Sequence, residues 1–355
     1  MLQAYDGGVT AAIVLAAGIV SVAGTQPQLA ATGDQVYLAV GVGNRISIAR
    51  SDDRGATFGA PVVLPDAGVL SLGRHRGPRI AATTQAVVVT AVAGAKGGGA
   101  DGDLLAWRSI DRGRTWSRPV TINRVRGAAR EGLHAFAADP SGLMVLAWLD
   151  LRQKGTRLYA AVSRDHGASW SSDRLVYASP SGTICQCCHP SIAIGTGGRI
   201  LVMFRNSLDG TRDLYVTESR DGETFAPPAK QGVGTWVLDA CPMDGGALVA
   251  TAGGVTSVWR READVFVASG SGPETKLGPG HDPTAAGSER GVDLAWTTAE
   301  GITVRMAGAA PTLVGPGGFA SLVARSDGLV VAWEHGGRTS VRVLPAVNAR
   351  PAARR

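Results

Sequence analysis

Residues 51–58 read SDDRGATF, and the same pattern returns as SIDRGRTW at residues 109–116 and as SRDHGASW at residues 163–170. A fourth copy, SRDGETF at residues 219–225, lacks one residue between its Asp and its Gly. The copies therefore begin 58, 54 and 56 residues apart. Each contains a Ser, an Asp two positions later, a Gly, a Thr or Ser, and a final aromatic residue. Five constrained positions at nearly constant spacing predict a repeated structural unit.

The physical chemistry of this motif is that of a turn. Its Asp can accept backbone N–H groups, its Gly tolerates a positive φ, and its aromatic ring can pack back between strands. Alternating, β-branched segments flank the copies, for example Arg45–Ala49 before the first copy and Pro61–Leu64 after it. The motif is therefore predicted to connect the third and fourth strands of each unit.

A second repeat opens the units. It reads QPQLA at residues 26–30, GPRIA at 77–81, HPSIA at 189–193 and DPTAA at 282–286. With degenerate copies included, strand openings fall near residues 27, 78, 134, 190, 244, 283 and 319. A unit of about 50 residues with four strands is typical of a propeller blade. We therefore predict an all-β propeller with seven four-stranded blades, with a six-bladed ring as the alternative.

The N-terminal segment 1–24 has two interpretations. Residues 9–23 are apolar and uncharged, so they could form a signal peptide or anchor, with Ser21–Ala23 as a cleavage site. The last unit also lacks a fourth strand, which residues 11–20 or 18–23 could supply to close the ring. The propeller is predicted to span residues 25–345, and the basic tail 346–355 to be disordered. We expect an exported protein, periplasmic or extracellular, that is either free or N-terminally anchored.

The composition is that of a folded globular chain, with 45% hydrophobic and 18% charged residues among 355. The net charge is +6, but the Arg residues are scattered and form no stripe outside the tail. Nucleic-acid binding is therefore not predicted. No segment after the N-terminus reaches the length of a membrane span, so we predict no integral membrane domain. We expect a monomer.

The repeated motif, together with the Trp-x-Asp-x-Arg pattern that begins at Trp148, resembles the Asp boxes of sialidases and BNR-repeat proteins. The resemblance covers about residues 25–345. It implies that the box residues, which include Asp53, Asp111, Asp165 and Asp221, are structural and lie on the periphery of the blades. It also implies an exo-sialidase-related glycoside hydrolase as the activity, if the chain is an enzyme at all. Sialidases usually have six blades, whereas seven units are counted here.

Sialidases bind the substrate carboxylate with three Arg residues and use an Asp as acid and a Tyr–Glu pair as nucleophile. By this resemblance Arg79 is the candidate first Arg, with Arg205 and Arg338 as second and third. The tyrosines do not fit, because Tyr37, Tyr159, Tyr177 and Tyr215 fall in second, third or fourth strands. We therefore expect no true sialidase activity.

Polar residues recur at the unit starts, where entry loops of a propeller converge and ligand sites form. The candidates for catalysis or binding at this channel mouth are Arg79, Glu131, His134, Asp282, Arg205 and Arg338. The first functional hypothesis is a propeller that binds or hydrolyses a glycan there.

The Cys residues form a separate candidate site. Cys185, Cys187 and Cys188 precede His189, and Cys241 precedes the next unit. Neighbouring blades place these segments together, so we expect the four sulfurs to converge. Disulfides and a metal site for Cu(I) or Zn, with the four thiolates and His189 as candidate ligands, both remain open. The sequence from Cys185 to His189 also satisfies C-x-x-C-H, but the extra Cys187 and the following Pro190 argue against c-type haem. A non-hydrolytic metal-binding propeller is thus the alternative function, and a plain interaction scaffold is a third.

Overall fold

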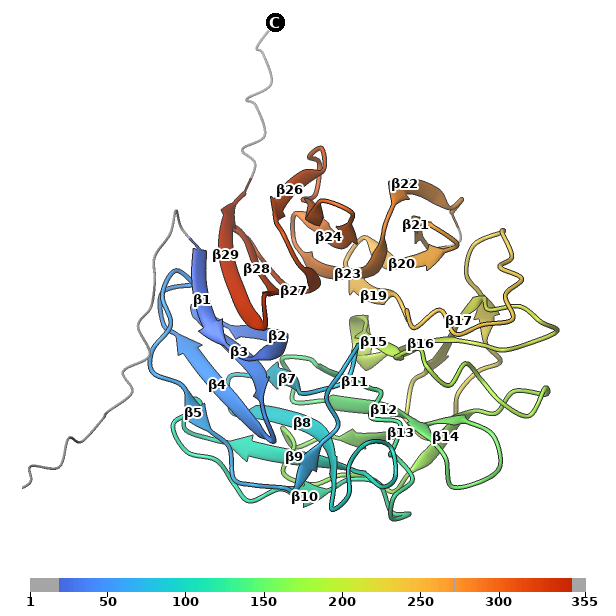
Figure 1. Ribbon diagram of the computed structural model, residues 1–355, viewed down its shortest axis with the longest axis horizontal. Coiled ribbons are helices and arrows are strands. Elements are labelled where there is room, and N and C mark those ends of the chain that lie inside the picture. The colour runs from blue at the N-terminus through green and yellow to red at the C-terminus, as the bar shows by residue number, and fades with distance from the viewer. Residues whose placement is uncertain (1–18, 271, 347–355) are drawn as a thin grey trace, which may run out of the picture.

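The computed structural model describes residues 19–270 and 272–346, and these residues form seven antiparallel sheets arranged around a central axis. Figure 1 shows the sheets as radial blades, with the first strand of each blade nearest the centre. This arrangement confirms the predicted seven-bladed propeller rather than the six-bladed alternative.

The first four blades follow the chain in order. Blade 1 contains β2 (Thr25–Thr32), β3 (Gln35–Val42), β4 (Arg45–Ser51) and β5 (Val62–Val63). Blade 2 contains β6 (Val69–Leu70), β7 (Arg79–Ala82), β8 (Val87–Gly94), β9 (Asp103–Ser109) and β10 (Val120–Thr121). Blade 3 contains β11 (His134–Ala138), β12 (Met144–Asp150), β13 (Arg157–Ser163) and β14 (Arg174–Tyr177). Blade 4 contains β15 (Ser191–Ile194), β16 (Ile200–Arg205), β17 (Leu214–Ser219) and β18 (Ala229–Lys230), with the 3-10 turn η1 (Thr196–Gly198).

The remaining blades complete the ring. Blade 5 contains β19 (Ala247–Thr251), β20 (Gly254–Arg261), β21 (Asp264–Ser269) and β22 (Thr275–Pro279). Blade 6 contains β23 (His281–Ser288), β24 (Gly291–Thr298), β25 (Gly301–Arg305) and β26 (Thr312–Gly315). Blade 7 contains β27 (Gly318–Arg325), β28 (Gly328–His335), β29 (Arg338–Pro345) and β1 (Ile19–Ala23). The inner strands β2, β7, β11, β15, β19, β23 and β27 begin within a few residues of the predicted openings, which confirms the repeat register.

The ring is closed by the N-terminal strand. β1 pairs with β29 from Ile19 opposite Arg342 to Ala23 opposite Arg338, so it is the outer strand of blade 7. Val20 is buried there, which gives the strand a hydrophobic anchor. This confirms the closing-strand prediction for residues 19–23, and cleavage after Ala23 would remove that strand. The signal or anchor prediction for residues 1–18 and the disorder prediction for residues 347–355 lie outside the described residues.

The Asp boxes lie between the third and fourth strands of blades 1 to 4, as predicted. In blade 2 the Asp111 carboxylate accepts the backbone N–H groups of Arg114 and Thr115 and the hydroxyl of Thr115. Ser109 accepts the N–H of Gly113 and donates to Asp111. The Thr115 hydroxyl is the main cause that lowers the pKa of Asp111 to about 2. The fourth box has one fewer residue in the left-handed region, yet Gly222 keeps a positive φ, and the contacts of Ser219 and the backbone N–H contacts to Asp221 are retained.

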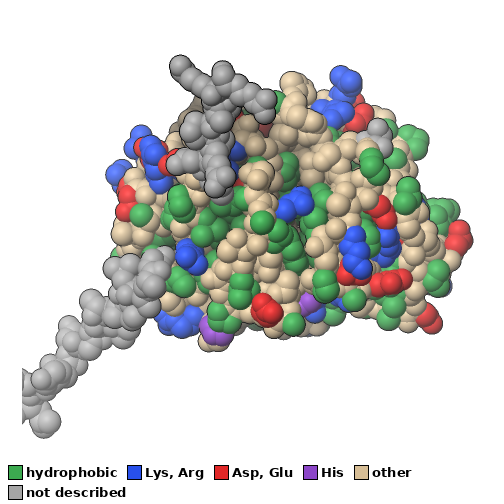
Figure 2. Space-filling view, turned by 90° about the horizontal axis from the view of Figure 1, so that it is seen from above, with side chains coloured by type: hydrophobic (Ala, Val, Ile, Leu, Met, Phe, Trp, Pro, Cys, Tyr) green, Lys and Arg blue, Asp and Glu red, His purple; other side chains and the backbone are tan. Residues whose placement is uncertain are grey.

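Seven hydrophobic clusters pack within and between the blades. Trp148, Trp333, Trp296 and Trp259, which lie in the second strands of their blades, are at most 3% exposed and belong to these clusters. In the side view of Figure 2, basic side chains are mixed with acidic and apolar ones, with no single large basic patch on that face. No helix among the described residues is long and apolar enough to span a membrane.

Candidate functional site at the channel mouth

The inner strand of blade 2 is interrupted where the other inner strands begin. β6 pairs with Ala93 and Gly94 of β8, and β7 pairs with residues 87–90 of the same strand. The eight residues 71–78 therefore leave the sheet between two short strands and form a loop over the channel. Gly73 and Gly77 adopt positive φ values in this loop, and a Cβ on Gly77 would approach the Gln26 side chain to 2.9 Å. The loop carries Arg74, His75 and Arg76 to the mouth.

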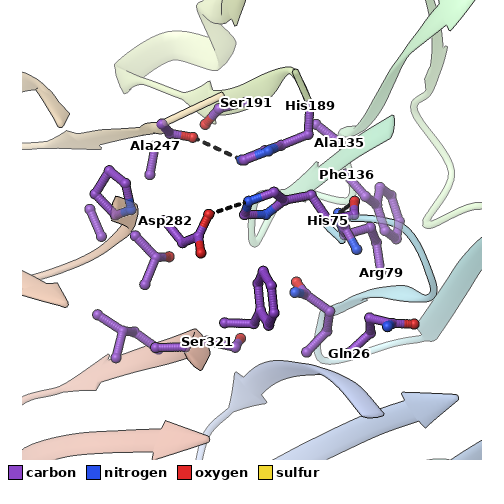
Figure 3. A pocket seen from close by; sticks show the side chains of 18 of the residues that line it. Gln26, His75, Arg79, Ala135, Phe136, His189, Ser191, Ala247, Asp282 and Ser321 are labelled. Carbon is purple, nitrogen blue, oxygen red and sulfur yellow. Dashed lines mark hydrogen bonds and ion pairs between the residues drawn. The ribbon is translucent and has the colours of Figure 1, made fainter. Parts of the chain in front are cut away.

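These side chains reach a cavity of about 250 Å³ that is lined by residues from all seven blades. His75 and Arg79 come from blade 2, His189 from the start of blade 4, Asp282 from blade 6 and Phe319 from blade 7. Figure 3 shows His75 pointing at Asp282 across the channel, with the His189 ring alongside. The cavity is the place where the predicted convergence of entry loops occurs.

Asp282 is the centre of the polar network. Its side chain is 1% exposed and accepts Arg74 at 2.9 Å, His75 Nε2 at 2.7 Å and His281 Nδ1 at 2.7 Å. Its backbone N–H donates to the Asp244 carboxylate at 2.8 Å. Burial by itself would raise the pKa of Asp282, but the hydrogen bonds from His281 and His75 and the charge of Arg74 hold that pKa well below its usual value. Asp282 therefore stays ionised across the physiological range.

The imidazole of His75 also forms part of an aromatic wall. It stacks on His189 with ring centroids 4.2 Å apart and meets the edge of Phe319 at 5.4 Å. His189 Nε2 lies 3.1 Å from the Gly246 carbonyl oxygen, so that nitrogen donates and Nδ1 is left without a partner among the described residues. Burial, reinforced by the charges of His75 and Arg79, lowers the pKa of His189 well below its ordinary value. His189 is thus a neutral ring with one free acceptor.

Arg79 is the cation of the cavity that lacks an acidic partner. Its guanidinium donates to the carbonyl oxygens of Pro78 and His75 at 3.0 and 2.7 Å, and among the described residues it forms no ion pair. Burial lowers the pKa of Arg79 to about 10, which still leaves it charged at neutral pH. An unpaired, partly desolvated guanidinium attracts an anionic group strongly.

The other predicted residues are distributed differently. Glu131 lies near the mouth and accepts Arg76 at 3.4 Å. His134 is fully buried beneath the cavity, contacts Thr90 at 3.0 Å, and has a pKa lowered to about 3 by burial and by Arg79. Arg205 is 1% exposed and donates to the carbonyl oxygens of Asp244, Arg212 and Arg260. Arg338 lies in β29 and donates to Ser21 of the closing strand. The structure therefore brings Arg79 and Asp282 together in the cavity, but not Arg205 or Arg338.

Two further residues near the mouth, His75 and Glu334, were not identified from the sequence. Glu334, near the end of β28, accepts the backbone N–H of Gln26. Burial raises the pKa of Glu334, while that hydrogen bond and His75 oppose the shift. The sequence feature that could have indicated His75 is the segment GRHRG at residues 73–77, in which two glycines flank two arginines and a histidine. Glu334 carries no comparable signal.

The Cys residues converge, as expected. Cys187 and Cys241 form a disulfide with Cα atoms 6.2 Å apart, and Cys185 and Cys188 are buried free thiols. The Cys185 sulfur lies 3.3 Å from that of Cys188 and 3.7 Å from that of Cys187. The hydrogen bond between Cys185 and Cys188 is the main cause that lowers the pKa of Cys185 to about 7, whereas burial and Cys185 raise the pKa of Cys188. Of the two interpretations left open, the disulfide is present for one pair.

The comparison with protein families identifies the repeats. A family model described as a BNR repeat-like domain matches residues 43–235, which is more than half of the chain. The chain belongs to the BNR repeat-like family. No curated protein sequence gives a significant match. Membership agrees with the four Asp boxes, all of which begin within the matched range.

Solved structures similar to this BNR-repeat chain include carbohydrate-active propellers. An α-L-arabinanase from Penicillium chrysogenum is 16% identical, with a TM-score of 0.55 over 92% of this chain and 93% of that one. A GH93 α-L-arabinofuranosidase from Fusarium graminearum is 14% identical, with a TM-score of 0.55 over 92% and 97%. The NanB sialidase from Streptococcus pneumoniae is 10% identical, with a TM-score of 0.51 over 76% and 64%. At these identities the similarity shows the shared fold.

The tyrosine needed by sialidase chemistry is missing from this BNR-repeat cavity. None of the described residues that line it is a Tyr. Tyr37 lies in β3, Tyr159 in β13, Tyr177 in β14 and Tyr215 in β17, all outside the inner strands. The described cavity residues therefore do not include the Tyr of a Tyr–Glu nucleophile.

Proposed function

We propose that the propeller binds an acidic glycan at the channel mouth, with the ligand carboxylate against Arg79. The single observation that carries this proposal is the charged Arg79 guanidinium that faces a polar cavity without an acidic partner. The neighbouring cations are already engaged, because Arg74 pairs with Asp282 and Arg76 pairs with Glu131. Arg79 is thus the group left to neutralise a ligand.

The rest of the cavity suits a sugar. The rings of His75, His189 and Phe319 offer an aromatic wall for the apolar face of a pyranose or furanose, and Gln26 and Ser191 offer polar groups for hydroxyls. The structural neighbours that share the fold are named as an arabinanase, an arabinofuranosidase and a sialidase, so this fold hosts glycan ligands elsewhere. Fold similarity supports the ligand class but does not choose the sugar.

Saturation-transfer NMR with a sugar panel tests this proposal. The panel pairs glucuronate, galacturonate and N-acetylneuraminate with neutral glucose, galactose and arabinose. We expect acidic members to bind and their neutral counterparts to bind at least about tenfold more weakly, since one charge-assisted contact is worth about 1.4 kcal/mol or more. Arg79→Gln should remove this preference, whereas Arg338→Gln, a matched change outside the cavity, should keep it. Equal binding of acidic and neutral sugars would contradict the proposal.

Hydrolysis of the bound glycan is a second candidate function. It is favoured by two carboxyl groups whose pKa values are shifted in opposite directions, downward for Asp282 in the cavity lining and upward for Glu334, which contacts the lining residue Gln26. Such a divergence is typical of a base or nucleophile paired with a general acid. In this role Glu334 donates a proton to the leaving oxygen as the glycosidic C–O bond breaks, and the ionised Asp282 stabilises the developing positive charge on the sugar. Water then adds to the anomeric carbon and returns a proton to the Glu334 carboxylate.

Aryl glycosides of the acidic sugars that bind provide the test for hydrolysis. We expect turnover to fall as the pH rises through the pKa of Glu334, because only its protonated form can donate. Glu334→Gln should abolish turnover while it leaves ligand binding within about twofold. An aryl sialoside should give no turnover. Hydrolysis by the Glu334→Gln variant at the wild-type rate would show that Glu334 is not the general acid, and only the binding proposal would stand.

We also propose that the protein is exported, as the apolar N-terminal segment suggests. The Cys187–Cys241 disulfide supports this, because disulfides persist in oxidising compartments. N-terminal sequencing of the protein from fractionated cells tests it. We expect the protein outside the cytoplasm, with a mature N-terminus no later than Ile19, since later cleavage would cut into β1.

A further inference from the structure

The four Cys sulfurs are a candidate site that the glycan proposal does not use. They come from two segments, residues 185–188 before β15 and Cys241 before β19, which lie side by side at the starts of neighbouring blades. Cys185 and Cys188 are 4% and 1% exposed, whereas Cys241 is exposed to solvent. The cluster therefore has a buried base and an open side through which a small ion can enter.

The separations between the sulfurs fit coordination of one ion. The sulfurs of Cys185, Cys187 and Cys188 lie 3.3, 3.7 and 3.9 Å apart, and the sulfur of Cys241 is bonded to that of Cys187. Four thiolates at about 2.3 Å from a tetrahedral Zn²⁺ are separated by about 3.8 Å. A hydrogen bond between two thiols spans a similar distance, but it accounts for a pair rather than for three mutual contacts.

The surroundings of the sulfurs also fit bound thiolates. The backbone of Cys187 lies beside the Cys185 sulfur, and the backbone of Asp244 lies beside the Cys188 sulfur. Such contacts orient thiolate ligands and stabilise their charge. The guanidinium groups of Arg205 and Arg212 act on Cys185 and offset the net negative charge that four thiolates and one Zn²⁺ would carry.

We propose that, when the Cys187–Cys241 disulfide is reduced, Cys185, Cys187, Cys188 and Cys241 bind one Zn²⁺ ion in a tetrahedral tetrathiolate site. A small dithiol supplies the two electrons that open the disulfide and is itself oxidised to a disulfide. The four thiols then release their protons as the metal binds. Zn²⁺ has no redox chemistry of its own, so the four sulfurs have two forms, a reduced and metal-bound form where a dithiol is present and the disulfide-linked form that persists after export.

The metal site would stabilise the arrangement of residues at the channel mouth. Cys188 is followed directly by His189, whose ring stacks on His75. Asp244, whose backbone contacts the Cys188 sulfur, accepts the backbone N–H of Asp282 through its carboxylate. Metal binding is therefore expected to fix the two segments that contain the Cys residues, which in turn position His189 and Asp282. The Zn²⁺ test itself needs no glycan.

The experiment compares reduced and oxidised full-length protein. Protein reduced with a dithiol and desalted without oxygen is titrated with Zn²⁺ against a chromophoric chelator, and its thiols are then mapped by alkylation and mass spectrometry. We expect one Zn²⁺ per reduced chain, with all four Cys protected from alkylation, and no stoichiometric binding by the oxidised protein. Co²⁺ should give the intense visible bands of a tetrahedral thiolate complex.

Variants separate the ligand set from the fold. Cys241→Ser changes the exposed ligand and should weaken Zn²⁺ binding more than about tenfold, since even the loss of a residue that only hydrogen-bonds a ligand costs about that much. His335→Gln, which changes an exposed ligand-type residue outside the cluster, should bind as wild type. Equal alkylation of wild-type thiols with and without Zn²⁺ would overturn the proposal. So would protection of Cys185 and Cys188 alone, or preference for Cu(I) at those two thiols.

Discussion

The Asp boxes and the channel mouth both hold an aspartate whose pKa is lowered, but by different means. Asp111 lies at the blade edge, nearly exposed, and is held by N–H and hydroxyl groups of its own turn. Asp282 is buried in the channel and is held by Arg74, His75 and His281, two of which come from another blade. The local network is repeated in four blades, whereas the long-range network occurs once. A repeated network maintains the fold, and an unrepeated one marks the site.

The largest expected effect comes from Asp282→Asn. Loss of this charge leaves Arg74 and His75 without their buried partner, and breaking such a network costs about 3 kcal/mol or more. We expect a lower free energy of unfolding by that amount, measured by denaturant titration, and loss of ligand binding by the folded fraction. A decrease in unfolding free energy of less than about 1 kcal/mol would mean that solvent reaches the Asp282 network. The difference between this buried network and the Asp boxes would then be smaller than we infer.

A smaller effect is expected from Asp111→Ala. The variant leaves several turn donors unpaired, but they are close to solvent, so we expect about 1 kcal/mol of destabilisation. Ligand binding per folded molecule should not change, because the box lies on the periphery. A folded variant without binding would place the box in the functional site and abolish the distinction between the two regions.

The smallest effect is a difference in pH dependence. The pKa of Asp111 is about 2 in the folded chain and about 3.9 in an unfolded one, so its stabilisation is present above about pH 4 and is lost as the pH falls through 2. The gap in unfolding free energy between wild type and Asp111→Asn should therefore narrow from pH 4 to pH 2. The gap for Asp282→Asn should narrow over the same range but remain open at pH 2 and close only at lower pH, because the pKa of Asp282 is held lower still. Complete closing of both gaps by pH 2 would show that the two carboxylates are held alike.

The same comparison explains how far the sequence predicts this molecule. The boxes, the number of blades and the starts of the inner strands can be predicted from the sequence, because each of these motifs occurs several times. It also places Asp282 and the Cys segments correctly, because they sit at repeat boundaries. His75 was missed because its loop interrupts a strand, and Glu334 because nothing in its local sequence marks it. Arg338 and Arg205 were proposed from residue type, but their strands direct them to Ser21 and to buried carbonyl groups instead of the cavity.

A crystal soaked with the acidic sugar that binds best in the panel tests the central claim most directly. The hollows that the described residues form include the channel cavity and a peripheral one between the boxes of blades 1 and 2, lined by Arg50, Asp53 and Arg114. We expect electron density in the channel, with the sugar carboxylate within hydrogen-bond distance of Arg79 and the ring against His75 and His189. A ligand seated in the peripheral hollow, with the channel cavity empty, would contradict the account.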